Sequence, residues 1–99
     1  MCGIAGCFGI QDTNTVDRML DALPHRGPND RGTHTFNGMV FGHTRLSIID
    51  VAGGHQPILA NEGRTGIICN GEIYNCWDLR EKVASKYQFK TKSDAEVIL

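Results

Sequence analysis

The sequence predicts a single α+β domain. Short segments rich in β-branched, aromatic and small residues alternate with two or three segments of helical periodicity. The 12 glycines among 99 residues indicate tight turns and close backbone contacts. A chain of this length holds one hydrophobic core, and a composition with 40% hydrophobic and 21% charged residues is typical of folded rather than disordered proteins.

The N-terminal residues predict a strand followed by a helix. Residues 3–10, GIAGCFGI, are small and apolar, as in a strand that packs closely through its glycines. Thr15 can cap a helix, and Pro24 ends it. The apolar residues of this helix recur at i, i+3, i+4 and i+7, which gives one buried face: Val16, Met19, Leu20 and Leu23.

A β-hairpin is predicted next. Residues 25–32, HRGPNDRG, are rich in turn-forming residues. The segments 33–36 and 39–43 flank Asn37-Gly38, which is a strong hairpin signal because both residues adopt positive φ readily. Residues 45–49 continue as extended chain and lead into an irregular loop at 50–57.

The C-terminal residues predict one more strand and two helices. Residues 65–69 are β-branched and end at the turn-forming Asn70-Gly71. Asn75 can cap a helix over residues 76–86, residues 87–91 read as extended, and SDAE at 93–96 has the pattern of a capping box. The apolar run of this last helix has only begun at Leu99, so we expect residues 1–99 to form the N-terminal part of a larger domain.

Charge and cysteine content exclude several classes. The formal net charge is -1, which gives no electrostatic basis for binding nucleic acid or an anionic membrane. No apolar run spans a bilayer, and no basic segment precedes an apolar one as in a secretory signal, so we expect a cytoplasmic protein with free thiols. The four cysteines contain no CxxC pair and the four histidines no HxxxH pair, so no metal site is expected.

Cys2 is the first candidate for chemistry. If the initiator Met1 is removed, Cys2 carries both a thiol and a free α-amine, and one residue then supplies nucleophile and base. Position alone favours an incidental cysteine, so the rest of the sequence has to decide between the two interpretations.

Six short motifs follow one another along the chain: MCGIAG at 1–6, HRGPND at 25–30, GHTRLSIID at 42–50, Gln56-Pro57, NGEIYN at 70–75 and SDAEVIL at 93–99. In this order they resemble the glutaminase (class II glutamine amidotransferase) domain of glutamine-dependent asparagine synthetases, from Met1 to Leu99. The resemblance implies the αββα sandwich of N-terminal nucleophile (Ntn) hydrolases, incomplete in these residues. Cys76, directly after NGEIYN, departs from the family pattern, which has small or polar residues there.

The resemblance also implies a mechanism. Cys2 attacks the side-chain amide of glutamine, a γ-glutamyl thioester forms, ammonia leaves, and water releases glutamate. The family places its oxyanion hole at the positions of Asn70 and Gly71, where an amide and an unobstructed backbone N–H stand. Without the resemblance, Asn-Gly is more simply a turn.

Substrate binding has its own candidates. Arg45 suits bidentate binding of the substrate α-carboxylate, and Asp94 and Glu72 can receive the α-ammonium. By resemblance, backbone groups of residues 46–49 line the same pocket: Leu46, Ser47, Ile48 and Ile49. The ordinary alternatives are solvated surface charges for Arg45 and Glu72 and a helix-terminal charge for Asp94. We assign His25, His43 and His55 to structure.

The blocks HTRLSIIDVAGGHQP and NGEIYN favour the asparagine-synthetase branch over relatives that carry a block resembling HTRWATHG. That branch implies a C-terminal synthetase domain which binds ATP and magnesium and passes ammonia to aspartate; no cofactor is expected in residues 1–99. Relatives with other acceptors, such as sugars or peptides, share this front half. Two alternatives are not enzymes: a module that binds glutamine without catalysis, and an inert fragment of a longer protein. A homodimer is an expectation that the sequence alone does not decide.

Overall fold

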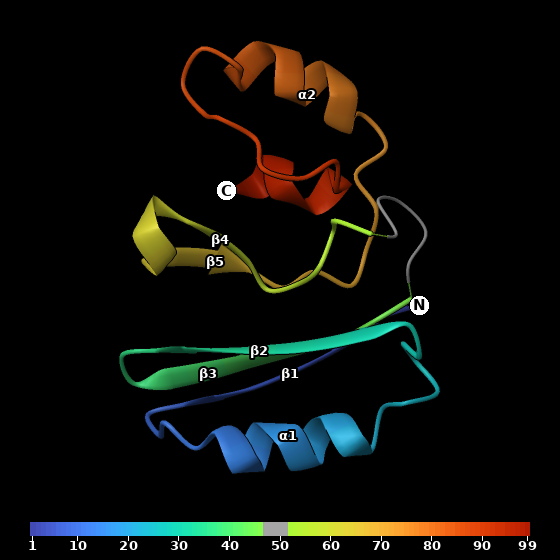
Figure 1. The fold of residues 1–99 in the computed structure, drawn as a ribbon, viewed down its shortest axis with the longest axis vertical. Helices are drawn as coiled ribbons and strands as arrows, with labels where there is room; N and C mark the ends of the chain where they lie inside the picture. The colour runs from blue at the N-terminus through green and yellow to red at the C-terminus, as the bar shows by residue number, and fades with distance from the viewer. Residues whose placement is uncertain (47–51) are drawn as a thin grey trace.

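In the part of the chain that the structure describes, the fold consists of two antiparallel sheets, two α-helices and two short 3-10 helices (Figure 1). The computed structural model describes residues 1–46 and 52–99. In chain order its elements are β1 (Gly3–Phe8), α1 (Thr13–Asp21), β2 (Asp30–Phe36), β3 (Met39–Arg45), β4 (Ile58–Ala60), the 3-10 helix η1 (Asn61–Gly63), β5 (Thr65–Ile67), α2 (Cys76–Val83) and the 3-10 helix η2 (Asp94–Ile98).

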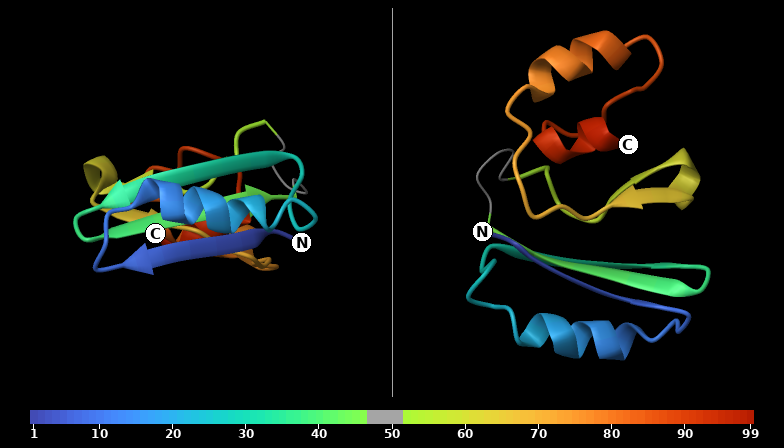
Figure 2. Two further views of the ribbon diagram at one scale, coloured as in Figure 1. Left: turned by 90° about the horizontal axis from the view of Figure 1, so that it is seen from below. Right: turned by 180° about the vertical axis from the view of Figure 1, so that it is seen from behind.

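The elements are arranged in layers. Helix α1 covers one face of the three-stranded sheet β1-β3-β2, and the β4-β5 hairpin lies on the other side of that sheet (Figure 1). Beyond β4 and β5 lie η2 and then α2, an order that is also seen from behind in Figure 2. The prediction of an α+β domain is therefore confirmed.

The three-stranded sheet brings the N-terminus to the end of β3. Strands β2 and β3 form the predicted hairpin, with Phe36 opposite Met39 and Gly38 at a φ of 81° in the two-residue loop. Strand β1 pairs with β3 on its other side, and Gly3 lies opposite Thr44. The residue before β1, Cys2, is thereby set beside the residues that follow Thr44.

The core of this half lies between the sheet and α1. Val16 and Leu20 of the helix and Val40 of β3 are fully buried against one another. A Cβ added at Gly42 would lie 2.6 Å from Val16 Cγ1, so the helix rests directly on the backbone of β3. Of the predicted apolar face, Val16 and Leu20 are buried, whereas Met19 is 42% exposed.

The predicted cap of α1 is wrong. The N-cap is Asp12, whose carboxylate accepts hydrogen bonds from the backbone N–H of Thr15 at 3.3 Å and from its hydroxyl at 2.6 Å. Thr15 is thus the third residue of the helix and donates to the cap. A carboxylate at this position satisfies a free N–H and complements the helix dipole, which favours the earlier start.

The elements that follow β3 have other bounds than predicted. Strand β4 was not predicted, and β5 ends at Ile67 rather than residue 69. Asn75 is the N-cap residue of α2 but makes no side-chain cap hydrogen bond, and the helix ends at Val83 rather than residue 86. Residues 87–91 contain no strand.

The predicted capping box at residues 93–96 is also wrong. Ser93 makes no cap hydrogen bond with its side chain, and its N–H donates to Thr91 Oγ1 at 3.1 Å. Glu96 turns instead toward the preceding segment, where its carboxylate accepts from the N–H groups of Lys90 and Thr91. The segment before η2 supplies more donors than a reciprocal cap would.

Candidate functional site

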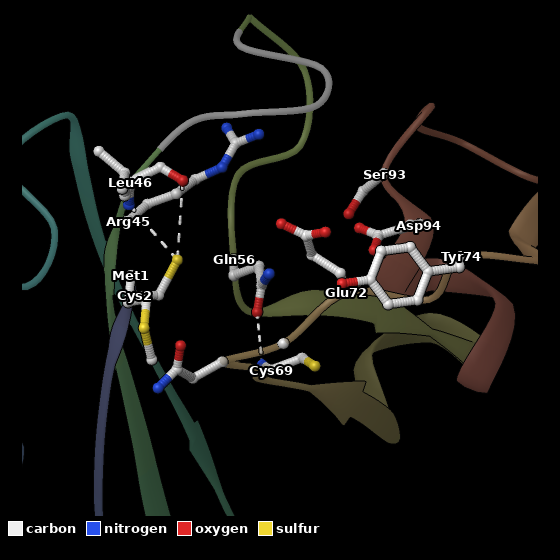
Figure 3. Close-up of a pocket in the computed structure, with 12 residues that line it drawn as sticks. Met1, Cys2, Arg45, Leu46, Gln56, Cys69, Glu72, Tyr74, Ser93 and Asp94 are labelled. Carbon is white, nitrogen blue, oxygen red and sulfur yellow. Dashed lines mark hydrogen bonds between the residues drawn. The ribbon is translucent and has the colours of Figure 1, made fainter.

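One pocket of about 260 Å³ gathers the predicted site residues (Figure 3). Those within the described ranges all line it: Cys2, Arg45, Leu46, Asn70, Gly71, Glu72 and Asp94. Ser47, Ile48 and Ile49 lie outside the described residues. Cys2 and Leu46, which are 44 positions apart in the sequence, meet here because β1 pairs with β3. The segment after β5 and the start of η2 supply the other predicted residues, Asn70, Gly71, Glu72 and Asp94.

Cys2 lies half-buried between the N-terminus and β1. The backbone N–H of Leu46 donates to its Sγ at 3.3 Å, and the thiol in turn lies 3.8 Å from the Leu46 carbonyl oxygen, as a donor to it. Both contacts follow from the antiparallel pairing that brings Cys2 to the end of β3. Met1 lines the same pocket, so its removal would free the α-amine of Cys2 and widen the pocket at once.

The pocket holds charges of both signs. Arg45, at the end of β3, is only 5% exposed, so its interpretation as a solvated surface charge is wrong. Asp94 is 8% exposed and accepts the N–H of Ile73 at 2.6 Å, whereas Glu72 is exposed. In Figure 3 the guanidinium lies across the pocket from the two carboxylates. This arrangement matches the opposite charges of a free amino acid.

Asn70 and Gly71 lie in the segment between β5 and α2 and are exposed to the pocket. Cys69, just before them, is fixed by hydrogen bonds: its N–H donates to Gln56 Oε1 at 2.7 Å, and its carbonyl oxygen lies 3.2 Å from His43 Nε2. An exposed amide and an exposed glycine N–H beside a thiol are donors suited to a developing negative charge.

Two thiols line the pocket, and their surroundings differ. Burial raises the pKa of Cys69, and the nearby charges of Asp94 and Cys2 raise it further, so this thiol stays protonated. Cys2 instead receives a backbone N–H at its sulfur. Since the thiolate is the nucleophilic form, the raised pKa makes Cys69 a poor nucleophile.

Gln56 is a pocket residue that we did not predict as part of the site. It is only 7% exposed, and the prediction used it only within the Gln56-Pro57 block of the family resemblance. A glutamine next to a proline in a glycine-rich loop carries no sign of burial by itself. Cys69, Tyr74 and Ser93 also line the pocket and were not predicted to belong to the site.

A buried polar cluster lies behind Asp94. Glu96 is fully buried and accepts hydrogen bonds from Tyr87, Lys90 and Thr91. Burial alone would raise the pKa of Glu96, but the hydrogen bonds from Lys90, Thr91 and Tyr87 outweigh it and hold the pKa below its usual value. Arg80 donates to the carbonyl oxygen of Ser93 at 2.7 Å. The residue before Asp94 is therefore held from the α2 side.

Neither metal ligands nor a membrane span are seen in the described ranges. Within residues 1–46 and 52–99, no three His, Cys, Asp or Glu side chains are grouped so as to hold a metal ion. In the same ranges no helix has the length and apolar character needed to cross a bilayer. The four cysteines are all free thiols.

Comparison with known proteins shows what this chain is similar to. The sequence profile of a family described as glutamine amidotransferase domain matches residues 1–99. Among curated proteins, the chain is 42% identical to asparagine synthetase [glutamine-hydrolyzing] 3 of Bacillus subtilis and 43% identical to asparagine synthetase B [glutamine-hydrolyzing] of Escherichia coli. It is 46% identical to a probable asparagine synthetase [glutamine-hydrolyzing] of Schizosaccharomyces pombe. Each match covers 100% of this chain but only 17–19% of the relative, so the chain spans about a fifth of their length.

Proposed function

The chain belongs to the glutamine amidotransferase domain family, and from this membership we propose that it hydrolyses the side-chain amide of glutamine with Cys2 as nucleophile. The observation that carries the proposal is a pocket in which the Cys2 thiol, a buried arginine and two carboxylates meet. Glutamine has the matching groups: an electrophilic amide, an α-carboxylate and an α-ammonium.

Arg45 binds the α-carboxylate of glutamine, and Asp94 with Glu72 binds the α-ammonium. The opposed positions of the cation and the carboxylates support this orientation, since a zwitterion then spans the pocket with its side chain free to reach Cys2 (Figure 3). The backbone of Leu46, which contacts the Cys2 sulfur, contributes a further polar contact on that side of the pocket.

The reaction proceeds through a thioester. The Cys2 sulfur attacks the amide carbon, and the tetrahedral oxyanion receives hydrogen bonds from the Asn70 side chain and the Gly71 N–H. Each such donor lowers the activation free energy by about 3 kcal/mol. The α-amine of Cys2, free once Met1 is removed, takes the thiol proton and gives it to the leaving nitrogen, so that ammonia departs. Water then attacks the thioester carbon, which releases glutamate and restores the thiol.

We assign the fold to the Ntn hydrolase type, an αββα sandwich with the nucleophile at the start of the first strand. The layer order from α1 through two sheets to η2 and α2 supports this assignment, as does the place of Cys2 directly before β1 (Figure 1).

In the whole protein, the ammonia passes to an ATP-activated aspartate, so that the overall product is asparagine. The relatives are asparagine synthetases by name, which supports this acceptor. ATP and magnesium belong to the synthetase domain of such proteins; the 99 residues contain no SGGxDS-type phosphate-binding loop, and no step here depends on these groups.

Cys2→Ala in the full-length protein tests the proposal. Glutamine-dependent product formation and glutamate release should fall by on the order of 10³-fold or more, whereas ammonia-dependent product formation should persist, because only the ammonia source is removed. Cys7→Ala is the matched control, since the Cys7 thiol contacts Ile10 and Asp12 outside the pocket. Mass spectrometry should find Cys2 as the N-terminal residue; equal loss of both activities in Cys2→Ala would make the cysteine structural.

A further inference from the structure

Gln56 connects the two halves of the molecule at the pocket. Its backbone packs on β2, where a Cβ added at Gly32 would collide with the Gln56 carbonyl oxygen. Its side chain reaches the other way, so that Oε1 accepts the N–H of Cys69 at 2.7 Å. The residue is 7% exposed and lines the pocket, although nothing in the proposed reaction uses it (Figure 3).

His43 binds the carbonyl group of Cys69, whose N–H donates to Gln56. This histidine of β3 is fully buried, and its Nε2 lies 3.2 Å from the Cys69 carbonyl oxygen. Burial lowers the pKa of His43, so the ring is neutral and carries its one N–H at Nε2, because a carbonyl oxygen can only accept. The N–H and the C=O of Cys69 are therefore both held by buried side chains.

The segment that follows Cys69 needs such support. Asn70 and Gly71 lie outside β5 and α2, so neither the sheet nor the helix holds them directly. At the far end, the N–H of Ile73 donates to Asp94. Asn70 and Gly71 lie between these two attachment points, at Cys69 and Ile73.

We propose that Gln56 and His43 are positioning residues that hold the Cys69 peptide groups and thereby fix the oxyanion-binding Asn70 and Gly71 relative to Cys2. The inference rests on the proposed glutamine hydrolysis. Donors of this kind act only when they meet the oxyanion at hydrogen-bond distance, and a displacement of about 1 Å is enough to lose much of the rate. Because the ground-state contacts of glutamine lie with Arg45 and Asp94, the effect falls on kcat rather than on substrate binding.

Gln56→Met and Gln56→Glu, made in the full-length protein, test this inference. Gln56→Met keeps the length of the side chain and removes its acceptor, so kcat for glutamine hydrolysis should fall about 10- to 100-fold, approaching the loss of an oxyanion donor. The KM for glutamine and the Kd for glutamate should change less than about twofold. Gln56→Glu keeps an acceptor oxygen for Cys69 and should restore most of kcat.

Gln11→Met is the matched control, because Gln11 also makes one side-chain hydrogen bond, to the Phe36 carbonyl oxygen, but away from the pocket. All variants are assayed below the onset of thermal unfolding. Unchanged kcat in Gln56→Met would overturn the inference, as would a loss that Gln56→Glu does not reverse or one that appears in KM. Wild-type protein without glutaminase activity would instead refute the proposed function itself.

Discussion

The two sides of the three-stranded sheet are stabilised differently. On the side of α1, the fully buried side chains are apolar: Val16 and Leu20 pack on Val40, and the charged residues of the helix remain at its surface. On the side of the pocket, many of the buried side chains are polar or charged: His43, Arg45, Gln56, Ser93, Asp94 and Glu96.

This difference separates stability from chemistry. Apolar contacts on the α1 side remove hydrocarbon from water and need no particular partner geometry. The buried polar groups of the pocket side are costly unless each finds its hydrogen bonds, so they stabilise one arrangement of the site rather than the fold in general. Substitutions on the two sides should therefore differ in which measurement they change.

Leu20→Ala should have the largest effect on stability. The side chain is fully buried between α1 and β3, and its loss should lower the free energy of unfolding by about 2–5 kcal/mol, as for other buried leucines. Chemical denaturation of the full-length protein measures this change. Met19→Ala on the same helix is the control, because Met19 is 42% exposed. The KM for glutamine of the folded variant should match wild type, and a raised KM would contradict the separation of the two sides.

Glu96→Gln should lower stability less and disturb the pocket. The Glu96 carboxylate accepts hydrogen bonds from two backbone N–H groups and two hydroxyls, which belong to Lys90, Thr91 and Tyr87. In the variant, the side-chain NH2 replaces one carboxylate oxygen, so that some of these donors face another donor. We expect a loss of about 1–3 kcal/mol together with a raised KM for glutamine, since the displaced segment carries Asp94. Glu81→Gln, at an exposed site on α2, should change neither quantity.

The pH dependence sharpens this prediction. The pKa of Glu96 is lowered in the folded protein, so the ionised carboxylate stabilises the fold at pH values above its usual pKa of 4.5, and that contribution is lost as the pH falls through the lowered value. The difference in stability between wild type and Glu96→Gln should therefore be full near neutral pH and shrink below about pH 4.5. A difference that grows on acidification would show that Glu96 is not held as a carboxylate.

The sequence predicted those parts of the fold that depend on neighbouring residues. Asn37-Gly38 predicted the hairpin because turn chemistry is local, and the i, i+3, i+4, i+7 pattern located α1. The caps were predicted wrongly because another hydrogen-bond partner was available in each case. Asp12 caps α1 and accepts from Thr15 itself, and Glu96 accepts from Thr91 rather than capping with Ser93.

The site could be predicted only in part for a similar reason. Motifs named Cys2, Arg45 and Asp94 as partners, and the pairing of β1 with β3 brings the first two together. Strand β4 was missed because three residues are too few to show a period. The support that Gln56 gives to Cys69 joins residues 13 apart across a loop, and no local pattern indicates which backbone N–H a buried glutamine will meet.

Arg31→Met should have the smallest effect, even though Arg31 makes more ion pairs than Arg80. Its guanidinium bonds to Asp21 at 2.6 Å and to Asp17 at 3.3 Å, but its side chain is 39% exposed, and water screens both pairs. We expect a loss of less than about 1 kcal/mol in the free energy of unfolding, which vanishes in about 1 M salt, where the Debye length is about 3 Å.

Arg80→Met is the contrasting variant, since the Arg80 side chain is 12% exposed and donates to Ser93 in the cluster behind Asp94. Its loss should be larger and less sensitive to salt, because the Arg80 side chain is mostly buried against the fully buried Glu96. Denaturation at low and high salt separates the two outcomes, and equal salt dependence for both variants would mean that the charges on the pocket side are no better shielded than those on the surface of α1.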